Sequence, residues 1–240
     1  LIRNYVWMGD TPVAVIEGEQ LSLTRAGTDQ GFGTCIGWPL PENSVRLIQI
    51  RDEAIADWHD DLLVAQGEIG EVTVAGPSAT DSYFRREQAN QLGKIREVLP
   101  QGIERIVHRM GDLAWQDSQG RLWFCGRKSQ RLQTGDGLLG TENVEPIFNV
   151  HPAVKRSALV GIGTYGEQKP VLCIEREPAN GMPEQQLRAE LLAIAGTYRH
   201  TQHIDTFLIH PGFPVDIRHN AKIGREQLTL WATQKLAQAS

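Results

Sequence analysis

Two charged residues of one predicted hairpin could together bind an anionic or polyhydroxyl ligand. Asp112 follows Gly111 at the start of a strand-like run, and glycine there lets a ligand or another backbone approach the carboxylate closely. An ionised carboxylate has two acceptor oxygens, which suits the paired hydroxyls of a ribose. Arg127 emerges from the far strand of the same hairpin and could grip a ribose or phosphate oxygen. An ordinary surface ion pair would leave the same pattern, so the spacing leaves both interpretations open.

A third charged residue, Lys222, lies in the segment PVDIRHNAKIGR (214–225), after a β-type run and before an amphipathic helix. Asn220, Ala221 and Gly224 leave little side-chain bulk around it. This setting presents a mobile point charge to an anion and does not bury a salt bridge. One interpretation is a lysine offered to developing negative charge in an active site that a domain movement closes. The other is a solvated lysine ahead of a terminal helix.

Two further motifs suggest sites that the sequence does not support. GIGTYG (161–166) fits the glycine pattern of a dinucleotide-binding turn, which requires a helix immediately afterwards. A second strand follows instead, so we predict a glycine-rich turn between strands. His200 and His203 lack the further ligands that zinc needs. They predict a solvated pair, and we expect no metal site.

Elements up to about residue 126 are mostly short strands, identified by apolar–polar alternation and turn residues. We predict strands at 45–50, 69–74 and 103–107, a helix at 87–99, and a hairpin of strands 113–116 and 122–125 around a turn at 117–120. Beyond a junction near 127–130, helices and strands mix, as in a small α+β domain. There we predict helices at 141–150 (with Thr141 as N-cap), 183–195 and 225–237, and strands at 158–162, 171–174 and 206–209.

Composition excludes several classes of protein. The net charge of −5 over 240 residues argues against a nucleic-acid binder that works by general electrostatics. No apolar run approaches the ~18 residues of a membrane-spanning helix. Cys35, Cys125 and Cys173 are far apart and odd in number, which predicts buried, reduced thiols in a cytoplasmic protein.

The ordered motifs of the chain resemble those of the adenylate-forming superfamily, which contains acyl-CoA synthetases, peptide-synthetase adenylation domains and luciferases. WFCGRKSQR (123–131), TEN-VEP-IFN and the PVDIRHNAKIGR segment look most like the β-lactone synthetase branch of bacterial long-chain olefin biosynthesis. The motifs are GTCIGWP (33–39), GEIGEVTVAGP with a downstream Tyr83 (67–83), HRMGD (108–112), GRKSQR (126–131), TENVEP (141–146) and NAKIGR (220–225).

The resemblance implies an α+β fold in two parts. Residues 1–127 would be the C-terminal part of a large N-terminal domain, with a strand-rich distorted barrel from about 30 to 127. Residues 128–240 would form a small, mobile lid domain.

The resemblance also implies a role for each of five residues. Asp112 would bind the ribose hydroxyls of ATP or acyl-AMP, and Arg127 would support the ribose and phosphate side. Ser129 would lie at the hinge between the domains. Lys222 would bridge the substrate carboxylate and the α-phosphate, where an ammonium lowers the cost of bringing two anions together. Tyr5 would stack on adenine.

Two departures from the family pattern limit this expectation. In the stretch YVWMG (5–9), Met8 and Gly9 replace the threonine and the metal-binding glutamate of the family, and glycine offers no carboxylate to Mg²⁺. The family's phosphate loop and most of its acyl pocket would precede residue 1. We therefore expect the C-terminal portion of a larger enzyme, unable to adenylate efficiently by itself.

Two functions remain open. The first is an ATP-dependent ligase that activates a fatty or β-hydroxy fatty acid as an acyl-adenylate, using Mg-ATP in the parent enzyme. Its product would be a thioester, with CoA as second ligand, or a β-lactone. Its partners would be the N-terminal part of the enzyme and other lipid or olefin enzymes. The second is a non-catalytic remnant that binds nucleotide or docks a partner.

Overall fold

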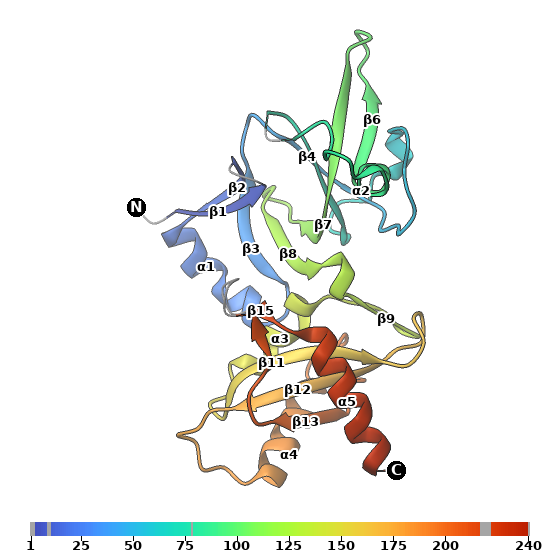
Figure 1. Cartoon of the computed structure of the whole chain (residues 1–240). Helices are drawn as coiled ribbons and strands as arrows, with labels where there is room; N and C mark the ends of the chain where they lie inside the picture. The colour runs from blue at the N-terminus through green and yellow to red at the C-terminus, as the bar shows by residue number, and fades with distance from the viewer. Residues whose placement is uncertain (1–2, 9–10, 78, 217–221, 240) are drawn as a thin grey trace. The chain divides into compact units, whose positions relative to one another are not determined.

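The computed structural model describes residues 3–8, 11–77, 79–216 and 222–239, and the side chains of residues 13–77, 79–216 and 222–238. The chain separates into two compact units (Figure 1). Unit 1 contains the residues up to Gly27 together with Phe32–Ser129. Unit 2 contains Thr28–Gly31 and the residues from Gln130 onward.

Unit 1 is built on a curled, antiparallel sheet in which β7 is the longest strand. The pairing of β7 changes along its length, from β6 at one end to β5 at the other, while β8 follows it through a hairpin. The strand order is β1 (Arg3–Met8), β2 (Thr11–Glu17), β3 (Thr34–Pro39), β8 (Leu122–Arg127), β7 (Glu104–Gln116), β5 (Gly70–Ala75) and β4 (Ser44–Ile48), with β6 (Lys94–Val98) beside β7.

The buried apolar residues of unit 1 form separate clusters against this sheet, and neighbouring residues of β5 belong to different clusters. Ile48, Ile95 and Val107 are fully buried in one cluster, which Leu62 also joins. The short helices lie around the sheet and contribute little to the core. They are α1 (Gly18–Asp29), η1 (Asp60–Leu62), α2 (Glu87–Gly93) and η2 (Lys128–Gln130).

The turn between β7 and β8 confirms the predicted hairpin. The carboxylate of Asp117 accepts hydrogen bonds from the backbone N–H groups of Gln119 and Arg121, both at 2.9 Å. Gly120 has φ +79°, a left-handed conformation that glycine adopts at no steric cost. Local turn chemistry thus sets the pairs next to the turn, and a register shift between Leu113 and Ala114 changes the pairing by one residue further along the two strands.

The predicted helix at 87–99 is wrong in its second half. The helix α2 ends at Gly93, and residues 94–98 form β6, which pairs with residues 104–108 of β7. Ile95 faces Val107 across the pair, and both side chains are fully buried. Burial in the sheet therefore outweighs the helical spacing of this segment.

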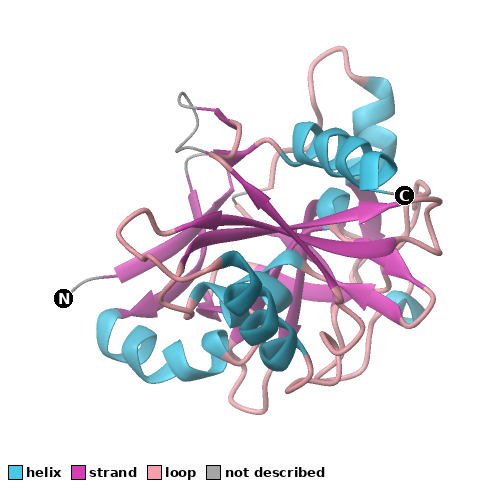
Figure 2. Ribbon diagram, turned by 90° about the horizontal axis from the view of Figure 1, so that it is seen from below, coloured by secondary structure: helices cyan, strands magenta, loops and turns pink. Residues whose placement is uncertain are grey.

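Unit 2 is a three-stranded sheet with helices on both faces. Strand β12 pairs antiparallel with β11 and parallel with β13. Figure 2 shows helices packed beside the strands. The elements are β9 (Leu132–Thr134), β10 (Gly137–Leu139), α3 (Thr141–Asn149), β11 (Val154–Ile162), β12 (Lys169–Arg176), α4 (Glu184–Ala195), β13 (Thr206–His210), β14 (Val215–Asp216), β15 (Lys222–Ile223) and α5 (Arg225–Ala239).

The two faces of this sheet hold separate cores, as the two-residue period of a strand requires. Leu159 and Leu172 point to the face that α3 and α4 cover. Their neighbours Val160 and Cys173 point to the opposite face, which Leu228 of α5 covers. The continuous apolar character of β11 and β12 follows from this two-sided burial.

Two local features of unit 2 were predicted from the sequence: a turn at 161–166 and the start of α3. Residues 161–166 lie at the turn of the antiparallel β11–β12 pair, which confirms a glycine-rich turn between strands. Thr141 was predicted as an N-cap, but it is the first helical residue of α3 and Gly140 occupies the cap position.

All three cysteines, Cys35, Cys125 and Cys173, are buried thiols as predicted. Burial raises the pKa of Cys173 to about 12, so this thiol stays protonated. No described helix is long and apolar enough to cross a membrane.

Candidate functional site

Strands β7 and β8 place Asp112 directly opposite Arg127. Arg127 Nη1 lies 3.0 Å from Asp112 Oδ1. Gly111, with φ +68°, has open space where a side chain would stand, so a ligand can approach the strand beside the carboxylate. The Arg127 side chain is 52% exposed and the Asp112 side chain 11% exposed. The hairpin thus joins a buried carboxylate to a cation that reaches solvent.

The carboxylate of Asp112 is held in an electrostatically costly position. Burial raises its pKa above the ordinary value of 3.8; the charge of Arg127 lowers the pKa and that of Glu71 raises it further. Oδ1 is buried, and within the described part of the chain it has no hydrogen-bond partner. Its contact with Arg127 is close enough for an ion pair but lacks hydrogen-bond geometry. An unsatisfied buried acceptor costs about 1–3 kcal/mol, so a ligand hydroxyl would relieve a penalty already present in the fold.

A buried ionic network beneath Asp112 was not predicted from the sequence. Glu71 on β5 is 1% exposed, and its Oε2 accepts a hydrogen bond from Arg109 Nη2 at 2.7 Å. Arg109, three residues before Asp112 on the same strand, also donates to the backbone oxygen of Glu53 at 2.7 Å. Lys128 follows Arg127 in the sequence, and its Nζ lies 3.0 Å from Glu71 Oε1. Glu71 lies among the apolar residues of β5, which could have indicated a buried charge with a partner, because buried charges need partners.

A pocket of about 420 Å³ opens beside this part of β7. Tyr83 lines it, and Tyr83 Oη lies 3.4 Å from His108 Nε2. Burial, followed by the charge of Lys94, lowers the pKa of His108 below 6.5, so its imidazole is neutral at neutral pH. The lining residues include Glu71, Tyr83, Arg86, Leu92, Gly111 and Lys128.

Lys222 lies in unit 2, at the start of β15, where its side chain is exposed. It faces Asp216 of β14 across a two-residue ladder, and Gly224 N–H closes the base of this hairpin with a 2.8 Å hydrogen bond to Pro214 O. Asn220 and Ala221 lie outside the described residues. Because Asp112 and Arg127 belong to unit 1, their meeting with Lys222 stays a prediction.

The remaining predicted site residues are described in part. Tyr5 lies in β1 opposite Val15, but its side chain is outside the described part of the chain, and so is Gly9. Met8 ends the same strand. Ser129 is exposed and is the last residue of unit 1, within η2. Its role as a hinge stays a prediction.

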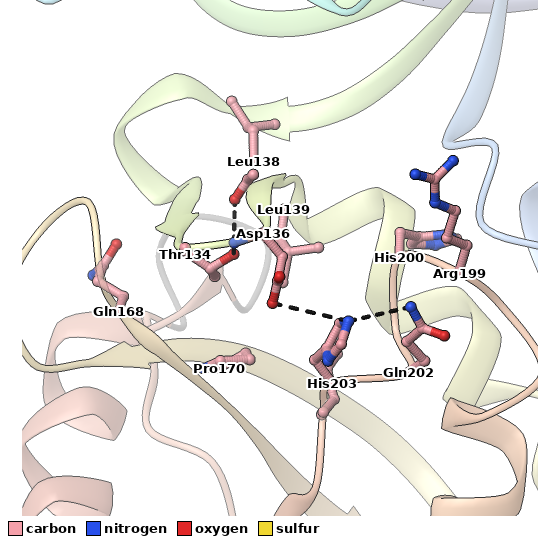
Figure 3. A pocket seen from close by; sticks show the side chains of 13 residues that line it. Thr134, Asp136, Leu138, Leu139, Gln168, Pro170, Arg199, His200, Gln202 and His203 are labelled. Atoms are coloured by element: carbon pink, nitrogen blue, oxygen red, sulfur yellow. Dashed lines mark hydrogen bonds and ion pairs between the residues drawn. The ribbon is translucent and has the colours of Figure 1, made fainter.

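The two histidines near residue 200 make separate contacts at the edge of a pocket of about 650 Å³ in unit 2. His200 donates through Nε2 to the backbone oxygen of Asn143 at 2.8 Å. His203 lies 3.9 Å from the carboxylate of Asp136 and 3.1 Å from Gln202 (Figure 3). Among the described residues, no group of three or more metal-binding side chains forms here or elsewhere.

Comparison with known proteins gives one strong similarity. No family model matches the chain. An olefin beta-lactone synthetase of Xanthomonas campestris pv. campestris is 54% identical over 225 residues, which are 93% of this chain and 40% of that protein. The olefin beta-lactone synthetase of Stenotrophomonas maltophilia is also 54% identical, over 94% of this chain and 41% of that protein. The chain thus spans about 40% of the length of these relatives.

Solved structures show the same fold at lower identity. The o-succinylbenzoate CoA synthetase of Bacillus subtilis, in complex with an acyl-adenylate intermediate, is similar with a TM-score of 0.68 and 21% identity, over 94% of this chain and 40% of that one. An amide bond synthetase of Marinactinospora thermotolerans is similar with a TM-score of 0.69 and 19% identity, over 95% of this chain and 41% of that one. The mixed α+β fold with its curled sheet therefore matches part of the ligase fold. Over the length compared, the chain belongs to the adenylate-forming superfamily and is homologous to a portion of the olefin beta-lactone synthetases.

Proposed function

We propose that the chain contributes a nucleotide-binding hairpin and a catalytic lysine to a ligase that activates a fatty or β-hydroxy fatty acid with ATP. The observation that carries this proposal is the buried Oδ1 of Asp112, which has no hydrogen-bond partner among the described residues and lies beside Arg127. A ribose hydroxyl would donate to this oxygen. Arg127, which is half exposed, would turn toward the ribose and phosphate oxygens.

Lys222 would act in the adenylation step. A carboxylate oxygen of the acid attacks the α-phosphorus of ATP, a new P–O bond forms, and the bond to the leaving pyrophosphate breaks. The attacking carboxylate and the phosphate are both anionic, so an ammonium between them lowers the barrier. The exposed position of Lys222 on a short hairpin suits a group that must reach a ligand. Ser129 would be the hinge of the movement that brings unit 2 to the nucleotide.

The described residues around Asp112 do not provide a site for the Mg²⁺ that accompanies ATP. Hard cations need several oxygen ligands. Arg109 and Lys128 already engage the carboxylate of Glu71, and no cluster of three acidic, histidine or cysteine side chains occurs in the described residues.

For the product, the β-lactone is the branch that the similarity to olefin beta-lactone synthetases favours. The β-hydroxyl oxygen of the substrate attacks the acyl carbon of the adenylate, the bond to AMP breaks, and the hydroxyl proton is released. In the thioester version, the thiol of CoA attacks the same carbon. A non-catalytic remnant is the second candidate, because Met8 and Gly9 stand where the family has a threonine and a metal-binding glutamate.

Binding of AMP tests the proposal, and saturation-transfer difference NMR detects it even at millimolar affinity. We expect saturation of the ribose protons by the wild-type protein and a strong reduction in Asp112→Asn, where an amide nitrogen replaces one acceptor oxygen. Asp57→Asn is the matched control, because Asp57 pairs with Arg96 at the surface of the same unit. Ribose saturation that is absent from the wild type, or equal in Asp112→Asn and the control, would overturn the proposal.

A further inference from the structure

The hairpin that carries Lys222 is fixed at its base by two buried carboxylates of unit 2. On the incoming side, Phe213 N–H donates to Glu175 Oε2 at 3.0 Å. On the outgoing side, the guanidinium of Arg225 is held by the carboxylate of Glu145. Lys222 therefore lies between two anchored points of the backbone.

The Glu145 anchor holds both terminal nitrogens of the Arg225 guanidinium. Arg225 Nη2 donates to Oε2 of Glu145 at 2.9 Å, while Nη1 donates to Oε1 of the same carboxylate, so the pair is bidentate. Oε1 of Glu145 also accepts the backbone N–H of Leu159 at 2.8 Å, and Arg225 Nη1 donates to Leu159 O at 3.2 Å. The pair thus ties α3, the middle of β11 and the first residue of α5 together. Such fork geometry fixes orientation as well as distance.

The Glu175 anchor uses three donors. Lys155 Nζ and Arg156 Nε each lie 2.7 Å from the carboxylate, in addition to the amide of Phe213. The Phe213 side chain is 5% exposed and packs under the guanidinium of Arg156. The chain therefore enters the hairpin from a fixed point on β12.

Stability alone does not account for the Glu145–Arg225 pair. Burying an ion pair contributes little net stability compared with apolar residues of similar size. Helix α5 already packs on the sheet through Leu228 and Ala232, which are both fully buried. What the pair adds is a defined direction for the first residue of α5, three positions after Lys222.

We propose that Glu145, acting through Arg225, is a positioning residue that fixes where the Lys222 ammonium lies. This inference rests on the proposed role of Lys222 in adenylation. If the Glu145–Arg225 ion pair breaks, the charge of Lys222 is unchanged, but its ammonium is no longer held in one position. Misplacement of a catalytic group by about 1 Å can cost about 10²-fold in rate.

The test compares Glu145→Gln and Arg225→Lys in the protein at the length at which the cell makes it. Both changes are conservative in size, so the sheet and its two cores should persist. Glu190→Gln is the control, because Glu190 pairs with the buried His151 at 2.8 Å in the same unit, away from the hairpin. Acid-dependent ATP–pyrophosphate exchange reports adenylation, and hydrogen–deuterium exchange of residues 222–224 reports the hairpin below the melting temperature.

We expect the turnover of pyrophosphate exchange to fall by roughly 10- to 100-fold in both variants, with the KM for ATP unchanged, on the scale of a ~1 Å misplacement. Amide exchange at 222–224 should accelerate in both variants and remain at the wild-type rate in Glu190→Gln. Wild-type turnover in both variants, while Lys222→Ala abolishes turnover, would overturn this inference and leave the proposed function standing. If Lys222→Ala itself retains wild-type turnover, both the positioning role of Glu145 and the proposed role of Lys222 are contradicted.

Discussion

At the scale of single residues, the candidate site depends on an aspartate that the fold holds at a cost. Asp112 is buried, its pKa is raised, and one of its oxygens has no hydrogen-bond partner among the described residues. A residue optimised for stability alone would not have these properties, since buried polar atoms are normally paired. Strain of this kind is typical of sites where a ligand completes the hydrogen bonding.

The raised pKa of Asp112 gives a pH-dependent stability prediction. A carboxyl whose pKa is higher in the folded protein than in the unfolded chain favours folding when protonated, and this contribution is lost as the pH rises from 3.8 through the raised value. We expect Asp112→Asn to have a larger free energy of unfolding than the wild type at neutral pH. The difference should shrink toward pH 3.8. Urea unfolding of both proteins across this range measures it, and a less stable Asp112→Asn at neutral pH would contradict the argument.

At the scale of elements, β7 organises the site because it pairs with three different strands. It carries Arg109 into the buried network and Asp112 onto the hairpin with β8. Lys128 connects the end of β8 to Glu71 on β5. The backbone of Arg127 is therefore held in two ways: Arg127 pairs with Asp112 across the β7–β8 hairpin, and the next residue, Lys128, pairs with Glu71.

Removal of Glu71 should destabilise unit 1 strongly. Glu71→Ala leaves the guanidinium of Arg109, which is 4% exposed, without its carboxylate. Breaking a buried pair in this way costs about 3–5 kcal/mol, which urea unfolding would measure. Glu104→Ala removes one of the two carboxylates that pair with Arg96 at the surface, where both side chains are more than half exposed, and should change stability little. If Glu71→Ala and Glu104→Ala lose similar amounts of free energy of unfolding, the buried pair of Glu71 and Arg109 does not stabilise unit 1 as proposed.

The sequence predicted those elements whose signals are local. The turn at Asp117 and Gly120 predicts the hairpin and brings Asp112 near Arg127. Their exact pairing could not be predicted, because a register shift between Leu113 and Ala114 sets Asp112 opposite Arg127. The end of α2 at Gly93 could not be predicted either, because residues 94–98 join the sheet through burial against β7. The spacing of apolar residues within this segment does not show that residues 94–98 pair with a distant strand and leave the helix.

The charged networks were equally hard to predict. Glu71 and Arg109 are far apart in sequence, as are Glu145 and Arg225, and only folding brings each pair together. Glu71, in the mostly apolar strand β5, is a signal that a buried partner exists. It does not say which residue that partner is.

At the scale of the whole molecule, the residues of the proposed chemistry are divided between two units. Unit 1 holds Asp112 and Arg127, and unit 2 holds Lys222 on its anchored hairpin. Each unit has its own core, so each can keep its part of the site in place independently. The proposed reaction requires the two parts to meet, with Ser129 at the boundary as the hinge.

The most direct measurement of the central claim is acid-dependent ATP–pyrophosphate exchange by the protein at its cellular length, with Lys222→Ala compared to the wild type. Loss of one charge-stabilising group costs about 2.7–4 kcal/mol, or roughly 10²–10³-fold in rate. We predict a decrease of that size in Lys222→Ala and none in Lys235→Ala, which removes an exposed lysine from α5 of the same unit. Equal exchange rates in the wild type, Lys222→Ala and Lys235→Ala would contradict the assignment of Lys222 as the adenylation lysine.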